Sequence, residues 1–459
     1  MIHFILNDKD IATDLPPGLP LLDFIRYRQH LYGTKIGCRE GDCGACTILV
    51  GTIKDDRVQY SSATSCLMPL GNAIGKHIVT IEGLNMKDLN PIQQAMSDKG
   101  ATQCGFCTPG FVVSLAGFIL SSKEPSYQNA IASINGNICR CTGYKSIERA
   151  ALQITELMND RDNKDPMEFV MERAMLPSYF QDIKQRLANT VSSRTVSTNN
   201  TGRRVSGGTD LYVQQQENMV HADIDFLFDR QEMKGITIVG DTCVLGSETT
   251  VTDIVESPIF QDHFPGISKF IKLVSSTPIR NMATIAGNFI NASPIGDLTI
   301  FFLALNAQLH LSDGQHQREL PLRSLYKGYK VLDKTDAEYI EKISFVLPGV
   351  NSRFNFEKVS KRTHLDIASV NSAMLISLEG NVIRSASISA GGVGPVPMYL
   401  ATSSKFLEGK ELCNDTVEAC LLHVDKEISP ISDTRGSVEY KRLLLKQLIR
   451  LHVMSFNDV

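Results

Sequence analysis

Short apolar stretches separated by polar turns open the chain. Residues 2–6 alternate in the manner of a β-strand, and the turn-forming residues 7–10 predict that the chain returns as the second arm of a hairpin. Apolar side chains between residues 21 and 25 then recur at helical spacing. Residues 47–50 and 58–60 predict further strands. The order strand, strand, helix, loop and strand indicates a small β-grasp domain.

Helical periodicity dominates the next part of the sequence. The predicted helices are 91–96, 111–120, 126–134 and 147–157. Further along, apolar strands interleave with glycine-rich turns. Near the end, the predicted elements are two strands at 373–378 and 382–388 and a helix at 443–453.

These patterns predict a multidomain α+β protein. A chain of 459 residues is too long for a single hydrophobic core. We expect a β-grasp domain, a helical domain, a linker, an α+β domain and a C-terminal α+β domain, at 1–82, 83–157, 158–175, 176–348 and 349–459.

Composition narrows the possible environments and partners. The net charge of -4 gives no general basic field, so nucleic acid is not an expected partner. The N-terminal residues lack the features of a signal peptide, and no stretch holds eighteen uninterrupted apolar residues, so we expect no membrane span. Eight of the 11 cysteines fall into two compact patterns rather than a disulfide framework. A reducing cytoplasm fits these features best.

The first cysteine pattern lies within residues 33–46 and reads G-T-K-I-G-C-R-E-G-D-C-G-A-C. Its spacing, C-x4-C-x2-C with a distant fourth cysteine, is that of the plant-type [2Fe–2S] site. A loop this tight also needs glycines, which adopt positive φ and let backbone N–H groups approach the cluster. Structural zinc sites commonly use two C-x2-C pairs, whereas this loop has one, so iron–sulfur is favoured over zinc. The predicted ligands are Cys38, Cys43, Cys46 and Cys66.

A second pattern combines C-x2-C with C-x-C. The sequences Q-C-G-F-C-T-P-G and N-G-N-I-C-R-C-T-G-Y supply Cys104, Cys107, Cys139 and Cys141. By itself this set suits either zinc or iron, since C-x2-C is common to both. Beside a plant-type loop in the same chain, iron–sulfur is the favoured interpretation. Arg39 and Arg140 adjoin cluster cysteines, where they could stabilise reduced clusters or simply face solvent.

Together, the two cysteine patterns resemble the iron–sulfur half of the molybdenum hydroxylases, the family of xanthine dehydrogenase and aldehyde oxidase. The resemblance implies two [2Fe–2S] clusters, one in a plant-ferredoxin-like domain and one in a helical domain. All eight cysteine positions of that family pattern are present at matching spacings.

A glycine turn follows at residues 205–213, V-S-G-G-T-D-L-Y-V. A strand running into Gly207, Gly208, Thr209 and Asp210 presents backbone N–H groups that suit a pyrophosphate. The same residues also suit an ordinary tight turn. The pattern is not G-x-G-x-x-G, so it does not support a Rossmann site.

The resemblance extends to the flavoprotein component of the family. Residues 277–298, rich in small and amide side chains, are similar to its FAD segment. The resemblance implies that Gly207–Asp210 cradle the pyrophosphate, and that FAD is also bound by Thr284, Gly287, Asn288, Asp297, Ile340 and Lys358. At Val274 the chain departs from animal relatives, which place an aromatic residue against the flavin.

The functional expectation follows from the order cluster, cluster, flavin, which resembles the small subunit of a bacterial-type xanthine dehydrogenase. The resemblance implies a large molybdopterin-binding partner in a heterotetramer or larger assembly. Electrons from hypoxanthine or xanthine oxidation to urate would pass through both clusters to FAD and then to NAD+. No catalytic acid or base is expected in this chain. The alternatives are another hydroxylase with an aldehyde or N-heterocycle substrate, and a zinc-stabilised scaffold protein.

Overall fold

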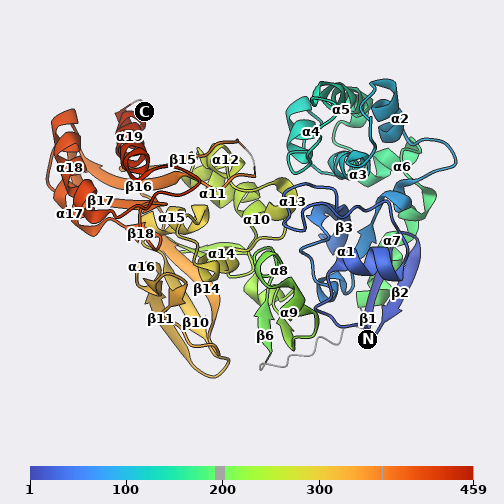
Figure 1. Ribbon diagram of the computed structural model, residues 1–459, viewed down its shortest axis with the longest axis horizontal. Helices are drawn as coiled ribbons and strands as arrows, with labels where there is room; N and C mark the ends of the chain where they lie inside the picture. Colours follow the sequence, from blue (N-terminus) through green and yellow to red (C-terminus); the bar gives the residue numbers. More distant parts are fainter. Residues whose placement is uncertain (192–201, 364, 458–459) are drawn as a thin grey trace. The chain divides into compact units, whose positions relative to one another are not determined.

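The computed structural model describes residues 1–191, 202–363 and 365–457 and divides into two compact units. Unit 1 comprises Met1–Phe228 together with Ser276–Ala283. Unit 2 comprises Asp229–Ser275 together with Thr284–Val459. Both units contain sheets and helices, which confirms the predicted multidomain α+β class (Figure 1).

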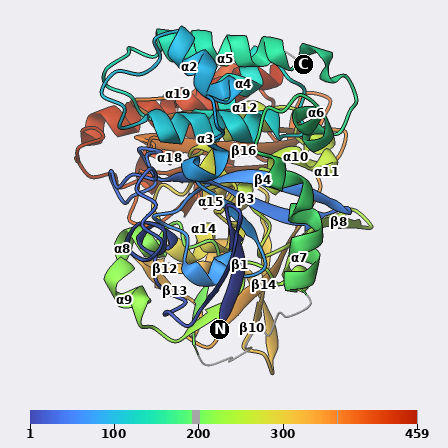
Figure 2. The same ribbon diagram turned by 90° about the vertical axis from the view of Figure 1, so that its right-hand side faces the viewer.

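A five-stranded sheet forms the first part of unit 1 (Figure 2). Its elements are β1 (Ile2–Leu6), β2 (Lys9–Thr13), α1 (Leu21–Asp23), β3 (Thr47–Lys54), β4 (Arg57–Thr64) and β5 (His77–Val79). β1 and β2 form the predicted hairpin, and the strand order is β2-β1-β5-β3-β4. The predicted helix begins as α1 and continues as a π-helix, Phe24–Arg28, whose Phe24 and Ile25 are buried in the sheet's core.

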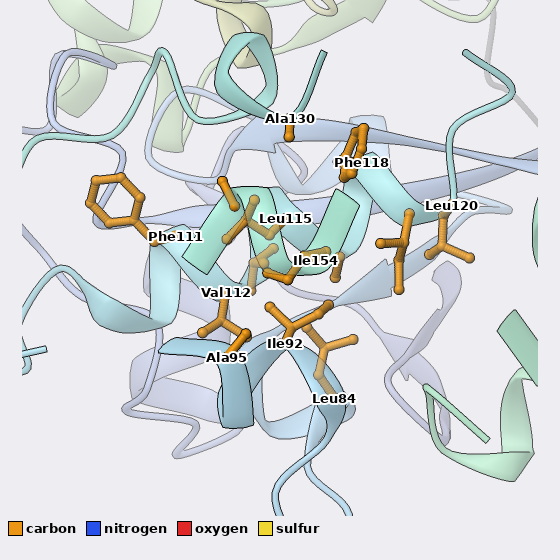
Figure 3. Packing of buried hydrophobic residues seen from close by; sticks show 14 of the residues in the cluster. Leu84, Ile92, Ala95, Phe111, Val112, Leu115, Phe118, Leu120, Ala130 and Ile154 are labelled. Carbon is orange, nitrogen blue, oxygen red and sulfur yellow. The ribbon is translucent and has the colours of Figure 1, made fainter. Parts of the chain in front are cut away.

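The predicted helices of the next segment are all present. They are α2 (Pro91–Asp98), α3 (Thr108–Ile119), α4 (Tyr127–Ser133) and α5 (Lys145–Leu157). Figure 3 shows α3 at the centre of their core, with Val112 directed toward Ile92 and Ala95 of α2. These side chains are at most 2% exposed, and burying a side chain of valine or isoleucine size contributes about 1.5–3 kcal/mol. α3 also packs on β3, so the helices and the sheet share one unit.

Residues 158–175, expected to be a linker, contain α6 (Pro166–Glu172). Phe169 and Val170 of this helix lie in the same core as α3, and the buried Arg161 donates to the carbonyl oxygens of Ser121 and Lys123. α7 (Ile183–Val191) then packs beside β1 and β3. The rest of unit 1 consists of β6 (Arg203–Val205), α8 (Leu211–Gln214), α9 (Gln216–Val220), β7 (Ile224–Phe226) and α13 (Thr277–Arg280).

Unit 2 begins with a second five-stranded sheet, ordered β11-β10-β14-β9-β8. Its strands are β8 (Ile236–Val239), β9 (Thr242–Gly246), β10 (Gln308–Ser312), β11 (Gln317–Pro321) and β14 (Tyr339–Val346). The accompanying helices are α10 (Val251–Glu256), α11 (Pro258–His263), α12 (Ile267–Lys272), α14 (Ile285–Asn291) and α15 (Asp297–Ala304). Edge-to-face contacts among Phe260, Phe302 and Phe345 join helices to this sheet.

A four-stranded sheet covered by helices completes unit 2. Its elements are β15 (Ser352–Val359), β16 (Val370–Glu379), β17 (Val382–Gly391), β18 (Met398–Tyr399), α17 (Ala401–Leu407), α18 (Asn414–Glu427) and α19 (Val438–Asn457). This confirms both predicted strands and the predicted terminal helix. α17 packs on β17 and α19 packs on β15 and β16. Within the described part of the chain, no helix has the combined length and hydrophobicity needed to cross a bilayer.

Candidate functional site

The first thiol set, Cys38, Cys43, Cys46 and Cys66, lies at one end of the β3–β4 hairpin. The antiparallel register pairs Thr47 with Thr64, so the cysteines just outside these positions come together. The Sγ atoms of Cys46 and Cys66 are 3.3 Å apart, and both residues are buried. The hairpin register therefore brings the distant fourth cysteine to the loop.

Backbone N–H groups of the loop point at its sulfur atoms. The N–H of Cys38 donates to Cys43 Sγ at 3.4 Å, and the N–H of Glu40 donates to Cys38 Sγ at 3.3 Å. The hydrogen bond from the Cys43 thiol, aided by backbone N–H donors, lowers the pKa of Cys38 to about 5, although burial opposes this effect. The same contact raises the pKa of Cys43, so one member of this pair is favoured as the thiolate, which is the form that binds iron.

Glycine is required in this loop for two different reasons. Gly41 and Gly44 have positive φ values of 79° and 67°. Gly37 has no such φ, but a Cβ there would lie 2.5 Å from Cys43 Sγ. The expectation of a glycine-dependent loop is thereby confirmed.

The second thiol set, Cys104, Cys107, Cys139 and Cys141, lies in the turns that lead into α3 and α5. The thiols of Cys104 and Cys141 lie near enough to shift each other's pKa, and so do those of Cys107 and Cys139. The N–H of Phe106 lowers the pKa of Cys104, and a helix N-terminus also favours a thiolate. Cys104 and Cys141 are exposed, and so are Phe106 and Tyr144 beside them.

All eleven cysteines are free thiols, and those of the two sets meet in close pairs. Among the described residues, no three metal-ligating side chains converge as they would around a single ion. A [2Fe–2S] cluster takes two thiolates on each of its two irons, so two pairs of thiols per set fit such a cluster. The donor chemistry of both sets therefore suits iron–sulfur clusters.

Asn137 ties the two thiol sets together within unit 1. Its Nδ2 donates to the carbonyl oxygen of Gly44 at 3.1 Å, and its Oδ1 accepts from Ser114 Oγ at 2.8 Å. The neighbouring Ile138 N–H donates to the carbonyl oxygen of Cys43 at 3.0 Å. A Cβ at Gly44 would collide with the carbonyl oxygen of Gly136. Sequence reasoning missed Asn137 because Gly44, to which it bonds, is 93 positions away. The only local signal is that this asparagine lies just before the C-x-C sequence.

The two arginines beside the cluster cysteines differ in their surroundings. Arg39 forms a two-pronged ion pair with Asp23, at 2.7 and 3.2 Å, and this contact raises the pKa of Arg39. Arg140 is exposed. Arg39 is thus held by a carboxylate, whereas Arg140 faces solvent.

The glycine turn at Gly207–Asp210 also belongs to unit 1 and connects β6 to α8. Gly208 has a φ of 85°, and a Cβ there would lie 2.7 Å from the carbonyl oxygen of Leu67, next to Cys66. A Cβ at Gly207 would collide with the carbonyl oxygen of Met282. This backbone suits both interpretations of the turn, a tight connection and a cradle for a phosphate.

The other six predicted FAD residues belong to unit 2. Thr284 precedes α14, and its Oγ1 accepts from the Gly287 N–H at 3.2 Å. Asn288 Oδ1 accepts from the N–H and hydroxyl of Thr299, at 3.1 and 2.9 Å. These bonds fasten α14 to α15, whose first residue is Asp297.

Lys358 and Asp297 form a buried ion pair. Lys358 Nζ donates to Asp297 Oδ2 and to the carbonyl oxygen of Leu273, each at 2.7 Å. The lysine side chain is 1% exposed and the aspartate side chain 13%. Leu273 precedes Val274, which is buried, so Lys358 also fastens the segment that contains Val274.

Ile340 lies in β14 and is 2% exposed. The carbonyl oxygen of its neighbour Glu341 accepts from Ser247 N–H at 3.1 Å, and the carbonyl oxygen of Ser247 accepts from Ala286 N–H at 3.3 Å. This chain of bonds links the strand of Ile340 to the start of α14. In unit 2, hydrogen bonds thus connect the strands of Ile340 and Lys358 to α14 and α15.

Sequence reasoning missed Asn371, which donates to Asp297 Oδ1 at 2.5 Å. Asn371 is fully buried, and its Oδ1 has no hydrogen-bond partner among the described residues. The partly exposed carboxylate of Asp297 beside a buried ammonium fits a site that receives a polar ligand such as FAD.

Four family models match successive parts of the chain. Residues 4–70 match a 2Fe-2S iron–sulfur cluster binding domain, and residues 80–152 match a [2Fe-2S] binding domain. Residues 177–347 match the FAD binding domain in molybdopterin dehydrogenase, and residues 356–454 match the CO dehydrogenase flavoprotein C-terminal domain.

Curated relatives match over most of this chain but are much longer than it. Xanthine dehydrogenase of Emericella nidulans is 28% identical over 89% of this chain and 35% of its own length. Aldehyde oxidase 1 of Macaca fascicularis is 25% identical over 97% of this chain and 38% of its own length. The chain therefore spans little more than a third of these relatives.

Two solved structures share the fold over part of the chain. CO dehydrogenase from Oligotropha carboxidovorans is 24% identical with a TM-score of 0.52, and the match covers 55% of this chain and 90% of that one. Quinoline 2-oxidoreductase from Pseudomonas putida 86 is 20% identical with a TM-score of 0.51, over 61% and 94%.

Two iron–sulfur domains followed by a flavoprotein define an oxidoreductase chain built for electron transfer. The order and identity of these domains are those of the iron–sulfur and FAD part of the molybdenum hydroxylases, and the chain belongs to that family.

Proposed function

We propose that this chain is the electron-transfer subunit of a xanthine dehydrogenase, acting between a molybdopterin-binding partner and NAD+. In this proposal the substrate is hypoxanthine or xanthine, which the partner oxidises to urate. The observation that carries the proposal is the direct tie between the two thiol sets in unit 1, on a chain that also bears the flavoprotein domains. Similarity to a xanthine dehydrogenase over 89% of the chain supports the purine substrate.

Each predicted residue has a place in this proposal. The two thiol sets would hold [2Fe–2S] clusters, and Gly207–Asp210, Thr284, Gly287, Asn288, Asp297, Ile340 and Lys358 would bind FAD. Bound clusters carry single electrons, and bound FAD supplies the chemistry that joins one-electron to two-electron transfer, which a hydride acceptor such as NAD+ requires. The protein's own part is to position these groups: Asn137 joins the two thiol sets within unit 1, and the buried ion pair orders the predicted FAD residues of unit 2.

The exposed edge of the second thiol set is the surface we propose for docking of the molybdopterin partner. Cys104 and Cys141 are exposed there, Phe106 is 47% exposed and Tyr144 is 38% exposed. Exposed aromatic side chains are typical anchors of protein interfaces. We further propose a heterotetramer or larger assembly located in the cytoplasm, since eight of the eleven cysteines form the two cluster sets rather than disulfides.

An equivalent subunit of another molybdenum hydroxylase is the second candidate. It is favoured by the similarity to aldehyde oxidase over 97% of the chain, and the pocket that selects the substrate would lie in the partner. The two candidates share the same electron carriers and differ only in the molecule oxidised.

One experiment on the natively purified complex separates these possibilities. Xanthine is added anaerobically while flavin and iron–sulfur absorption are recorded, and NAD+ is added afterwards. Bleaching by xanthine and recovery on NAD+ is the expected result. If both chromophores are present but only an aldehyde or N-heterocycle bleaches them, the second candidate is correct. A chain that contains zinc, with neither acid-labile sulfide nor flavin, would instead be the zinc-stabilised scaffold.

A further inference from the structure

Lys358 and Asn371 occupy directly opposite positions on neighbouring strands. They are Cα partners in the β15–β16 ladder, so their side chains leave the sheet on the same face. Both reach Asp297: Lys358 Nζ bonds one carboxylate oxygen at 2.7 Å and Asn371 Nδ2 bonds the other at 2.5 Å. A single cross-strand pair therefore holds both oxygens of one carboxylate.

Asn371 also fastens the loop that leads into α15. Its Nδ2 donates to the carbonyl oxygen of Ile295 at 3.2 Å, two residues before Asp297. On the adjoining strand its Cα partner is Gly391, where a Cβ would collide with Asn371 Oδ1. The backbone N–H of Gly392 donates to the carbonyl oxygen of Pro294 at 3.0 Å. Asn371 of β16 and Gly392, directly after β17, thus both bond to the loop at Pro294 and Ile295, which leads into α15.

The amide and the ammonium have separate effects on the carboxylate. Lys358 supplies a positive charge, which offsets the cost of burying the Asp297 carboxylate. Asn371 carries no charge. Its planar amide is fully buried and closely packed against Gly391, so it fixes the direction of its hydrogen bond to the carboxylate. The Asp297 carboxylate, whose side chain remains partly exposed, is therefore held in one orientation.

We propose that Asn371 is a positioning residue of the flavin site, acting through Asp297, with Gly391 making room for its amide. This inference rests on the proposed FAD-binding function of Asp297. Asn371 fixes the plane of the carboxylate and the loop before it, so that the site is formed before FAD enters. Neither Asn371 nor Gly391 belongs to the residues that the family resemblance singled out.

The test measures FAD affinity in the full chain, by titrating flavin-free protein and recording flavin fluorescence. Asn371→Leu keeps the volume of the side chain but cannot donate, and loss of a hydrogen bond to a charged group should weaken FAD binding about 10- to 100-fold. Asn371→Ser, which is smaller and also cannot reach Asp297, should give a similar loss if Asn371→Leu does not fold. Asn381→Leu, in the exposed turn between β16 and β17, is the matched control and should bind FAD normally.

A double-mutant cycle with Asp297→Asn separates positioning from general damage. If Asn371 acts through Asp297, adding Asn371→Ser to Asp297→Asn should cause almost no further loss of affinity. Losses that simply add, or full affinity in both Asn371 variants, would overturn the inference. If the unaltered chain itself fails to bind FAD, the proposed function fails instead, whatever the variants do.

Discussion

The two thiol sets offer four cysteines each, in contrasting surroundings. In the first set Cys46 and Cys66 are buried and are brought together by the register of a β-hairpin. In the second set Cys104 and Cys141 are exposed in the turns that precede two helices. The contrast shows how similar ligands can serve different tasks: a buried site keeps a carrier away from water and oxidants, whereas an exposed one can meet a partner.

The largest expected effect follows from removing a buried ligand of the first set. Cys66→Ser should abolish one cluster and lower the iron content from about four to about two atoms per chain, because each [2Fe–2S] cluster holds two. The second set should keep its signal in electron paramagnetic resonance spectra of the reduced protein. Cys413→Ser, at an exposed cysteine outside both sets, is the control and should retain all the iron.

Metal removal tests the difference in exposure directly. When the complex is treated with a chelator and mild oxidant, the cluster of the second set should disappear before that of the first, because two of its thiols are exposed. Successive spectra of samples reduced after treatment would show the order. Equal rates of loss would contradict the protective effect that we attribute to burial.

Two glycines provide a matched pair of substitutions, one in each set. Gly105 has a φ of 81° and open space for a Cβ among the described residues, so Gly105→Ala should cost only backbone strain, about 1–2 kcal/mol. Gly44 has a φ of 67° and would also clash with Gly136, so Gly44→Ala should cost about 3 kcal/mol. Anaerobic urea titration followed by visible circular dichroism would measure the stability of both variants. Equal unfolding midpoints for the two variants would show that the contact between Gly44 and Gly136 contributes little to stability.

The most gradual expected effect concerns acid. His77 is buried in the β-grasp domain, where its ring nitrogens contact Tyr60 and the carbonyl oxygen of Asn7, and burial lowers the pKa of His77 from 6.5 to about 3. Below pH 6.5 the unfolded chain binds a proton there that the folded chain does not. Stability should therefore fall as the pH falls from about 6.5 towards 3, by up to about 1.4 kcal/mol per pH unit.

Burial likewise lowers the pKa of His452, in α19 of unit 2, to about 3, so each unit contains one such buried histidine. The variant His77→Gln should be less stable at neutral pH but should show a shallower acid dependence. Urea unfolding at several pH values measures both effects, and an unchanged pH dependence would mean that other groups control acid stability.

Hydrophobic periodicity was sufficient to predict the helices and the principal strands, because α2, α3 and α5 each bury one continuous apolar face or are buried all round. It was also sufficient for the β1–β2 hairpin, since a short turn joins two alternating strands. It did not reveal α6, because the charged and proline-containing stretch before it resembles a linker although Phe169 and Val170 enter the core.

Cysteine spacing was sufficient to predict two ligand sets because loop geometry around a metal is largely local, and glycine positions in the first loop follow from the same local need. The contacts that complete the sites join residues far apart in the chain. Cys46 meets Cys66 through strand register, Asn137 meets Gly44 across 93 positions, and Asn371 meets Asp297 across 74. Such contacts leave no periodic trace in a sequence, because they depend on how sheets and helices pack, and packing is a property of the folded chain.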